Sequence, residues 1–308
     1  MKILYISDRH LPLGPKEPIR PEMRMKLRWM NTFGENLADR FEYRLRQEAL
    51  MVKDYTDKWL KIHNSDYHLI IDGGDNSLPL SRHTDRLRAT RIVWTRQLKN
   101  YGESRLLILT GNHELGHGYE PESASYVDLM DLRKELFQRE INRLGYGWEQ
   151  HQGVNLIALD SELIYLASRY PNDHLISQHY HQMYKKYNEA LQQPGAAVLV
   201  THNTTRILRH LRTNGALMKL NRNNRKVILV GGHYHIQRIC HRKGISIYWS
   251  GGASYPEPFL RWMELIPAPL FGFVPGGAGG IEIMLTKGKI SAKHCPFGIS
   301  CGFIPRFQ

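Results

Sequence analysis

Short runs of apolar residues recur along the chain, and each run is bounded by glycine, aspartate, asparagine or histidine. The runs are rich in Ile, Leu and Val, and they have the length and composition of strands that are buried on both faces. They lie at residues 2–7, 69–72, 105–110, 154–160, 196–201 and 226–230. We therefore predict a buried strand at each of these positions.

Longer segments of helical period separate the runs. In residues 35–62, for example, apolar side chains recur close to one helical stripe. The other helical segments are residues 85–101, 124–144, 174–193 and 205–213. Alternation of strand and helix is typical of a largely parallel sheet with helices on its faces, so we predict an α/β fold.

The pattern changes after residue 230. Residues 245–250, 280–285 and 290–293 have strand character, and the turn residues 286–289 connect the last two as a hairpin. These segments predict a mixed sheet. Residues 255–280 form a Pro/Gly-rich, partly apolar loop. No shift in composition marks a second domain, so we predict a single domain over residues 1–308.

Composition and charge narrow the class of protein. The chain is 42% hydrophobic and 23% charged, which excludes global disorder and fibrous repeats. Its 42 Lys and Arg against 29 Asp and Glu give a net charge of +13, which favours an anionic partner. Every hydrophobic run is far shorter than the ~18 apolar residues of a membrane span.

The cysteines and the first residues predict the compartment. The apolar run at residues 3–6 is too short for the core of a signal peptide. Cys240, Cys295 and Cys301 are odd in number and have no C-x-x-C spacing, so we expect reduced thiols. We therefore predict a cytoplasmic protein.

Residues of the types that commonly act as metal ligands follow five of the predicted strands. They are Asp8, His10, Asp75, Asn112, His202, His233 and His235. In open α/β sheets ligands bind beyond the carboxyl ends of the strands, so we expect these side chains to converge at one edge. Imidazole mixed with carboxylate and amide oxygen suits Mn²⁺, Fe or Zn²⁺ better than Ca²⁺ or Mg²⁺, and we favour Mn²⁺. The set exceeds the roughly four protein ligands of one ion, so we predict two divalent ions bridged by Asp75.

The ordered series D-x-H, G-D, G-N-H-E, H and G-H-x-H between residues 8 and 235 resembles the calcineurin-like metallophosphoesterase superfamily. The resemblance implies a four-layer αββα sandwich with mixed β-sheets, which here would carry a basic helical insertion at about residues 20–62. It implies that Asp8, His10, Asp75 and His235 hold one ion. It also implies that Asp75, Asn112, His202 and His233 hold the second.

The resemblance also implies a mechanism. A metal-bridging hydroxide would attack phosphorus in line, because the cations lower the pKa of bound water. His113, which is not a ligand, would protonate the leaving oxygen or stabilise charge on the phosphoryl group. Arg9, His117 and Tyr234 are candidates for substrate contacts, with a solvated charge at the rim as the alternative for Arg9.

Departures from the family motifs bear on the substrate. Leu78 stands where the family often has the last aspartate of G-D-x-x-D, and the G-D-x-H-G and G-D-x-V-D-R-G forms of Ser/Thr protein phosphatases are missing. The G-H-x-H pair resembles the branch that contains DNA-repair nucleases, nucleotide phosphodiesterases and lipid-precursor pyrophosphatases. We therefore expect a phosphodiester or pyrophosphate as substrate, with diesters favoured over phosphomonoesters.

Two questions stay open at this point. The basic segment 20–61 is a solvated cap, a surface for nucleic acid or a surface for an anionic membrane, and we favour the cap. The alternative function is a catalytically silent protein that keeps the fold and binds nucleic acid or a partner through its basic helices. The sequence does not predict an oligomeric state.

Overall fold

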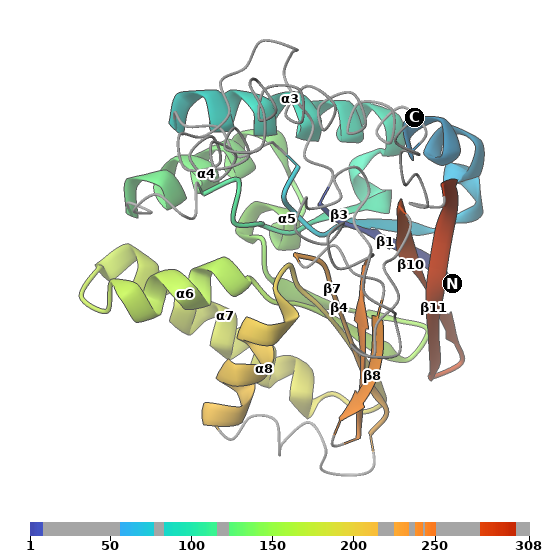
Figure 1. Ribbon diagram of the computed structural model, residues 1–308. Coiled ribbons are helices and arrows are strands. Elements are labelled where there is room, and N and C mark those ends of the chain that lie inside the picture. The colour runs from blue at the N-terminus through green and yellow to red at the C-terminus, as the bar shows by residue number, and fades with distance from the viewer. Residues whose placement is uncertain are drawn as a thin grey trace, which may run out of the picture.

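The computed structural model describes residues 1–8, 56–76, 83–115, 123–214, 225–233, 238–242, 244–250 and 278–299. Two mixed sheets lie face to face, and helices cover both outer sides (Figure 1). The predicted α/β fold with four layers is therefore confirmed. The predicted insertion is described only at its end, where residues 56–63 are helical, and the predicted loop only at residues 278–280.

The first sheet has the strand order β11-β10-β1-β2-β3. The strands β1, β2 and β3 are parallel, whereas β10 runs antiparallel to β1, and β11 to β10. Their bounds are Lys2–Ile6 for β1, Leu69–Asp72 for β2, Leu106–Ile108 for β3, Ala278–Thr286 for β10 and Lys289–Ile299 for β11. The predicted hairpin at the end of the chain is the pair β10 and β11.

The second sheet has the order β4-β5-β6-β7-β9-β8. The inner strands β5, β6, β7 and β9 are parallel, and the edge strands β4 and β8 are antiparallel to their neighbours. The bounds are Gly147–His151 for β4, Val154–Ala158 for β5, Ala196–Val200 for β6, Val227–Gly231 for β7, Arg238–Arg242 for β8 and Ile245–Trp249 for β9.

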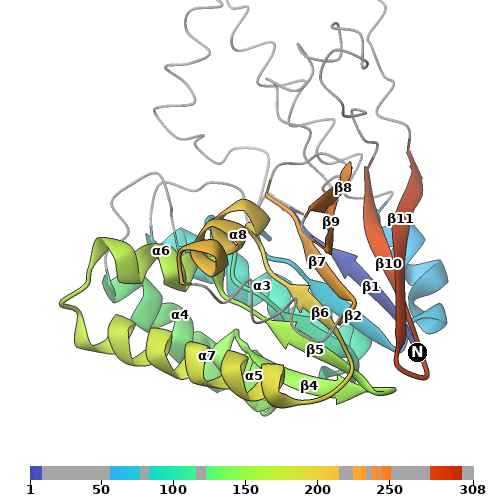
Figure 2. The same cartoon turned by 90° about the horizontal axis from the view of Figure 1, so that it is seen from below.

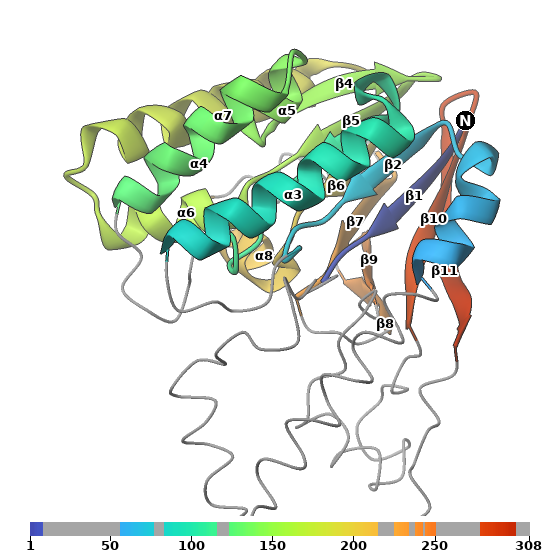
Figure 3. The ribbon, with the colours of Figure 1, turned by 90° about the horizontal axis from the view of Figure 1, so that it is seen from above.

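The helices divide between the two outer sides. Helices α3, α4 and α5 lie on the side of the first sheet (Figure 3), and α6, α7 and α8 on the side of the second (Figure 2). Their bounds are His83–Tyr101 for α3, Ser123–Leu136 for α4, Glu140–Leu144 for α5, Ser161–Arg169 for α6, His174–Gln192 for α7 and Thr204–Thr213 for α8. Short 3-10 turns, η2 (Asn64–Asp66) and η3 (Glu103–Arg105), precede β2 and β3.

Each strand serves two apolar layers. In β1, Ile3 and Tyr5 face the second sheet, and Leu4 and Ile6 face the helices, because side chains alternate along a strand. All four side chains are fully buried, which explains the uninterrupted apolar run. The strands are thus fixed by packing on both faces, and their carboxyl ends are held firmly enough to carry a site.

Most predicted elements are confirmed. The predicted helix at residues 124–144 is two helices, because α4 ends at Leu136 and α5 begins at Glu140. Strands β4 and β8 and helix α6 have no counterpart among the predicted elements. The prediction of a single domain remains a prediction. Among the described residues, no helix is long and apolar enough to cross a membrane.

Candidate metal centre

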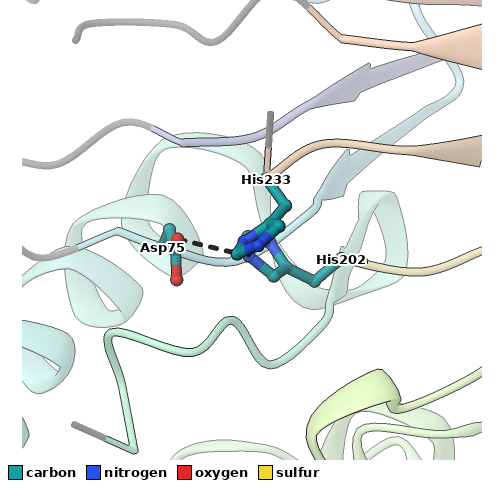
Figure 4. A group of neighbouring side chains, drawn as sticks. All are labelled: Asp75, His202 and His233. Carbon is teal, nitrogen blue, oxygen red and sulfur yellow. Dashed lines mark hydrogen bonds and ion pairs between the residues drawn. The ribbon is translucent and has the colours of Figure 1, made fainter. Parts of the chain in front are cut away.

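Asp75, His202 and His233 meet where the two sheets come together (Figure 4). Asp75 follows β2 of the first sheet, and His202 and His233 follow β6 and β7 of the second. One potential ligand atom from each lies within 4.8 Å of the other two. The structure therefore places these three residues close together beyond the strand ends, and their role as metal ligands stays a prediction.

Asn112 adds a fourth donor atom to this group. Its Oδ1 lies 3.0 Å from His202 Nε2 and 2.9 Å from His233 Nδ1. His202 Nε2 lies 3.2 Å from Asp75 Oδ2 and 3.2 Å from His233 Nδ1. Ligand bonds of about 2.0–2.2 Å around one ion place neighbouring donor atoms about 3.0–3.5 Å apart. The four residues therefore fit a divalent cation in both chemistry and spacing.

The His202 ring is oriented by a second contact. Its Nδ1 lies 2.9 Å from the carbonyl oxygen of Gly73, which accepts the Nδ1 proton. The lone pair of the neutral ring is then on Nε2, which faces the other three donor atoms. His202 has no exposed surface, so this orientation is also held by packing.

Three of the candidate ligands have left-handed backbone conformations. Asp8, Asp75 and His233 have φ values of 56°, 55° and 74°. Such values are uncommon outside glycine and tend to cluster at functional sites. Gly232 lets the backbone approach closely, because a Cβ there would overlap Ser7 Oγ and Asp8 Oδ2. The backbone at these strand ends therefore adopts uncommon conformations, and these conformations direct the candidate ligands towards one another.

Glu114 fastens two of these loops together. Its carboxylate accepts the backbone N–H groups of Gly111 at 2.8 Å, Asp75 at 3.0 Å and Asn76 at 2.7 Å. Burial, together with the nearby Asp75 carboxylate, raises the pKa of Glu114 to about 7. Glu114 thus holds the loop that carries Asp75 against the loop that carries Asn112.

Asp72, at the end of β2, fixes the loop of Asp75 from the other side. Its Oδ1 accepts the Gly74 N–H at 3.0 Å and the Asn76 side-chain amide at 2.9 Å. Its Oδ2 accepts a hydrogen bond from Gln97 of α3. Leu78, where the family often has an aspartate, lies outside the described residues.

Asp8 and His113 lie beside the group. The Asp8 carboxylate accepts the His233 N–H at 3.0 Å and the Ser7 hydroxyl at 2.5 Å. His113 donates its backbone N–H to Asp75 Oδ1 at 2.8 Å, and its Nε2 lies 3.6 Å from Asp75 Oδ2. The His113 side chain is 17% exposed, whereas that of Asp75 is 2% exposed. His113 is therefore within reach of solvent while Asp75 is not.

The centre attracts positive charge. Burial opposes a charge on His202, but the carboxylates of Asp75 and Asp8 outweigh burial and raise the pKa of the ring to about 10. The carboxylates around His202 therefore favour a positive charge at this position.

The remaining candidates lie outside the described residues. They are the ligand candidates His10 and His235 and the candidates for substrate contact Arg9, His117 and Tyr234. The structure therefore brings together the four ligands predicted for the second ion and describes two of those predicted for the first, Asp8 and Asp75. Sequence reasoning assigned no role to Asp72 or Glu114, although both are acidic residues within or next to motifs that it used.

The family model of calcineurin-like phosphoesterases matches residues 1–237. The chain belongs to the calcineurin-like phosphoesterase family. This phosphoesterase is therefore a metal-dependent hydrolase of phosphoric ester bonds. No curated protein matches its sequence.

Solved structures share the fold of this phosphoesterase at low sequence identity. A dimetal phosphatase from Danio rerio is 9% identical, with a TM-score of 0.53 and 96% of each chain covered. A purple acid phosphatase from yellow lupin seeds is 11% identical, with a TM-score of 0.52, 96% of this chain and 51% of that chain covered. The anchor protein of the inner membrane complex of Plasmodium is 10% identical, with a TM-score of 0.51, 97% of this chain and 85% of that chain covered.

Proposed function

We propose that this phosphoesterase hydrolyses a phosphodiester or a pyrophosphate with two divalent metal ions held at the strand ends. The observation that carries the proposal is the convergence of four donor atoms, from Asp75, Asn112, His202 and His233, each of which lies 2.9–3.2 Å from at least one of the others. Diesters remain favoured over monoesters on the motif pattern.

Asp75, Asn112, His202 and His233 would hold one ion. Asp8, His10, Asp75 and His235 would hold the other, with Asp75 shared. When bound, divalent ions polarise a phosphoryl oxygen and lower the pKa of an attacking water. The buried Asp72 and Glu114 carboxylates keep the ligand loops in place by accepting backbone N–H groups, so little reorganisation is needed when metal enters. We favour Mn²⁺, with Fe and Zn²⁺ as alternatives.

His113 would act on the leaving group. Its ring is within 3.6 Å of the Asp75 carboxylate, yet it is partly exposed, so it can contact both the centre and a substrate. An imidazole that donates a proton to the leaving oxygen, or a hydrogen bond to the phosphoryl group, would work at neutral pH. Arg9, His117 and Tyr234 would add contacts to the substrate.

A catalytically silent scaffold is the second candidate. It is favoured by one observation, that an anchor protein of Plasmodium shares this fold. Fold alone does not decide function, but every ligand position of the motif series is kept in the sequence, which argues for a working centre. A scaffold would keep its affinity for nucleic acid or a partner after metal is removed, and it would cleave no phosphoester.

The test compares bis(p-nitrophenyl) phosphate with p-nitrophenyl phosphate, using protein that has been stripped of metal and resupplied with Mn²⁺, Zn²⁺ or Fe²⁺. We expect hydrolysis that depends on metal and is faster with the diester. Faster hydrolysis of the monoester would reverse the preference. Two bound ions without hydrolysis of either compound, or of a pyrophosphate, would favour the scaffold.

The same protein preparation can distinguish a nucleic-acid substrate from a lipid-linked substrate. A nuclease would use the +13 net charge, and its affinity for nucleic acid should fall steeply with salt through release of counterions. A lipid-linked substrate would require detergent or vesicles. The cytoplasm remains the predicted compartment, based on the odd number of cysteines without C-x-x-C spacing.

A further inference from the structure

We propose that the first turn of α6, residues 160–162, is a positioning element for the metal centre, and that Ser161 and Glu162 set the geometry of His202. The inference rests on the ligand set proposed above. Neither residue belongs to a family motif used in the sequence analysis, and both are buried, with exposures of 0% and 1%. Their contacts lead directly to the segment that carries His202.

Ser161 contacts the residue that follows the ligand. Its hydroxyl oxygen accepts the backbone N–H of Asn203 at 3.0 Å, and the hydroxyl group donates to Glu162 Oε1 at 3.2 Å. Asn203 in turn caps α8 by accepting the N–H of Arg206 at 3.1 Å. The Ser161 hydroxyl therefore ties the start of α6 to the end of β6, one peptide unit from His202.

Glu162 links Ser161 to the helix that follows the same ligand. Its Oε1 accepts a hydrogen bond from Arg206 Nη1 at 2.5 Å. Arg206 belongs to α8, whose N-cap Asn203 follows His202 directly in the chain. By joining the Ser161 hydroxyl to Arg206, the Glu162 carboxylate restricts movement of the segment that carries His202.

Asp160 joins this turn to the loop of Asn112. Its Oδ1 accepts the N–H groups of Glu162 and Leu163 at 2.9 Å each, and thereby begins α6. Burial raises the pKa of Asp160, and the charge of Arg133 and a hydrogen bond from Thr110 oppose that rise. Arg133 is also fully buried and donates to Thr110 Oγ1 at 2.9 Å. Thr110 precedes the loop of Asn112, so one helix turn is linked to two ligand-bearing segments from different sheets.

The experiment measures binding of Co²⁺ to metal-free protein, by competition with a chelator for affinity and by visible absorption for the geometry of coordination. The variants are Ser161→Ala and Glu162→Gln. Matched controls are Ser177→Ala, in the first turns of α7, and Glu149→Gln, a carboxylate that also accepts hydrogen bonds from an arginine. Ser161→Thr keeps the hydroxyl and serves as the conservative variant.

We expect Ser161→Ala and Glu162→Gln to bind one of the two ions about 10–100-fold more weakly, with altered absorption, as for loss of an outer partner of a ligand. The controls should match wild type, and Ser161→Thr should recover most of the affinity. Wild-type binding by Ser161→Ala would overturn the positioning role, even if Glu162→Gln bound weakly, because only the serine variant preserves charge. Failure of the wild type to bind metal would instead refute the proposed function.

Discussion

The Nε2 atom of His202 lies 3.0 Å from Oδ1 of Asn112, although 90 residues separate them and they belong to different sheets. Because the Nδ1 proton of His202 is donated to the carbonyl oxygen of Gly73, a neutral ring has a lone pair on Nε2. This lone pair would face a lone pair on Oδ1 of Asn112. Two such atoms repel each other unless positive charge lies between them. The carboxylates of Asp75 and Asp8 raise the pKa of His202 against burial, so the surroundings of this pair also favour a positive charge, as a divalent cation would supply.

Replacement of His202 with alanine should remove one of two bound ions. The expected result is a fall from about two to about one metal ion per chain after dialysis against Mn²⁺, because one ion loses an inner ligand. The control is His210→Ala, a half-buried histidine on α8 that contacts Tyr180 and lies outside the candidate ligand set. Equal metal content in the two variants would show that His202 is not a ligand.

Replacement of His113 with alanine should separate catalysis from metal binding. We expect a fall in kcat of about 10²–10⁴, the range for loss of a general acid, with metal content unchanged. His113 interacts with Asp75 through its backbone N–H as well as its ring, and the backbone contact survives the substitution. The measurement is kcat and metal content in the same preparation, and parallel loss of both would count against the assigned role.

Gly111→Ala should disrupt the centre by steric overlap. A Cβ at this position would overlap the backbone nitrogen and Oδ1 of Asp75, and it would lie 2.8 Å from Oε2 of Glu114. We expect loss of metal and activity. The control Gly288→Ala meets no atom within 4 Å, although its φ of 79° should cost some stability. Metal retained by Gly111→Ala would contradict the close packing of these loops.

Glu149→Gln should lower stability in a manner that depends on pH. A hydrogen bond from His151 and two from Arg139, against the opposing effect of burial, lower the pKa of Glu149 to about 2 from an ordinary value of 4.5. A lowered pKa stabilises the folded state above pH 4.5, and this contribution is lost as the pH falls towards 2.

We therefore expect the variant to be less stable by about 1–2 kcal/mol near pH 6, a figure reduced because the carboxylate is partly exposed. The difference should shrink between pH 4.5 and pH 2. Urea unfolding of both proteins in chelator measures it without interference from metal loss. A difference that stays constant over this range would show that the ion pair is not its source.

The strands that carry the centre could be predicted because they are buried on both faces. Ala196–Val200 and Val227–Gly231, for example, contain no polar side chain, so their sequence pattern predicts a buried strand without an alternative. By contrast, β4 has the sequence GWEQH and is half-exposed at a sheet edge. Its polar residues interrupt the apolar pattern, so the sequence did not predict a strand there. The predicted helix over residues 124–144 contains no glycine or proline before its break, so sequence offered no sign that α4 ends at Leu136.

The candidate ligands could be predicted from strand ends and motif order, whereas the residues that support them could not. Arg133 is fully buried, yet its contacts with Thr110 and the carbonyl of Ile108 arise only when α4 packs beside β3. Ser161 likewise gains its role from the meeting of α6 with the end of β6. Such contacts join segments that are distant in the sequence, so no local pattern of polar residues predicts them.

The most direct test of the account is hydrolysis of bis(p-nitrophenyl) phosphate by wild type and Asp75→Asn, each resupplied with Mn²⁺. Asparagine tolerates the left-handed backbone of this position, where φ is 55°, so the fold should survive. We predict that the variant loses more than the roughly 100-fold expected of an outer partner, together with bound metal. Full metal-dependent hydrolysis by Asp75→Asn would contradict the proposed centre.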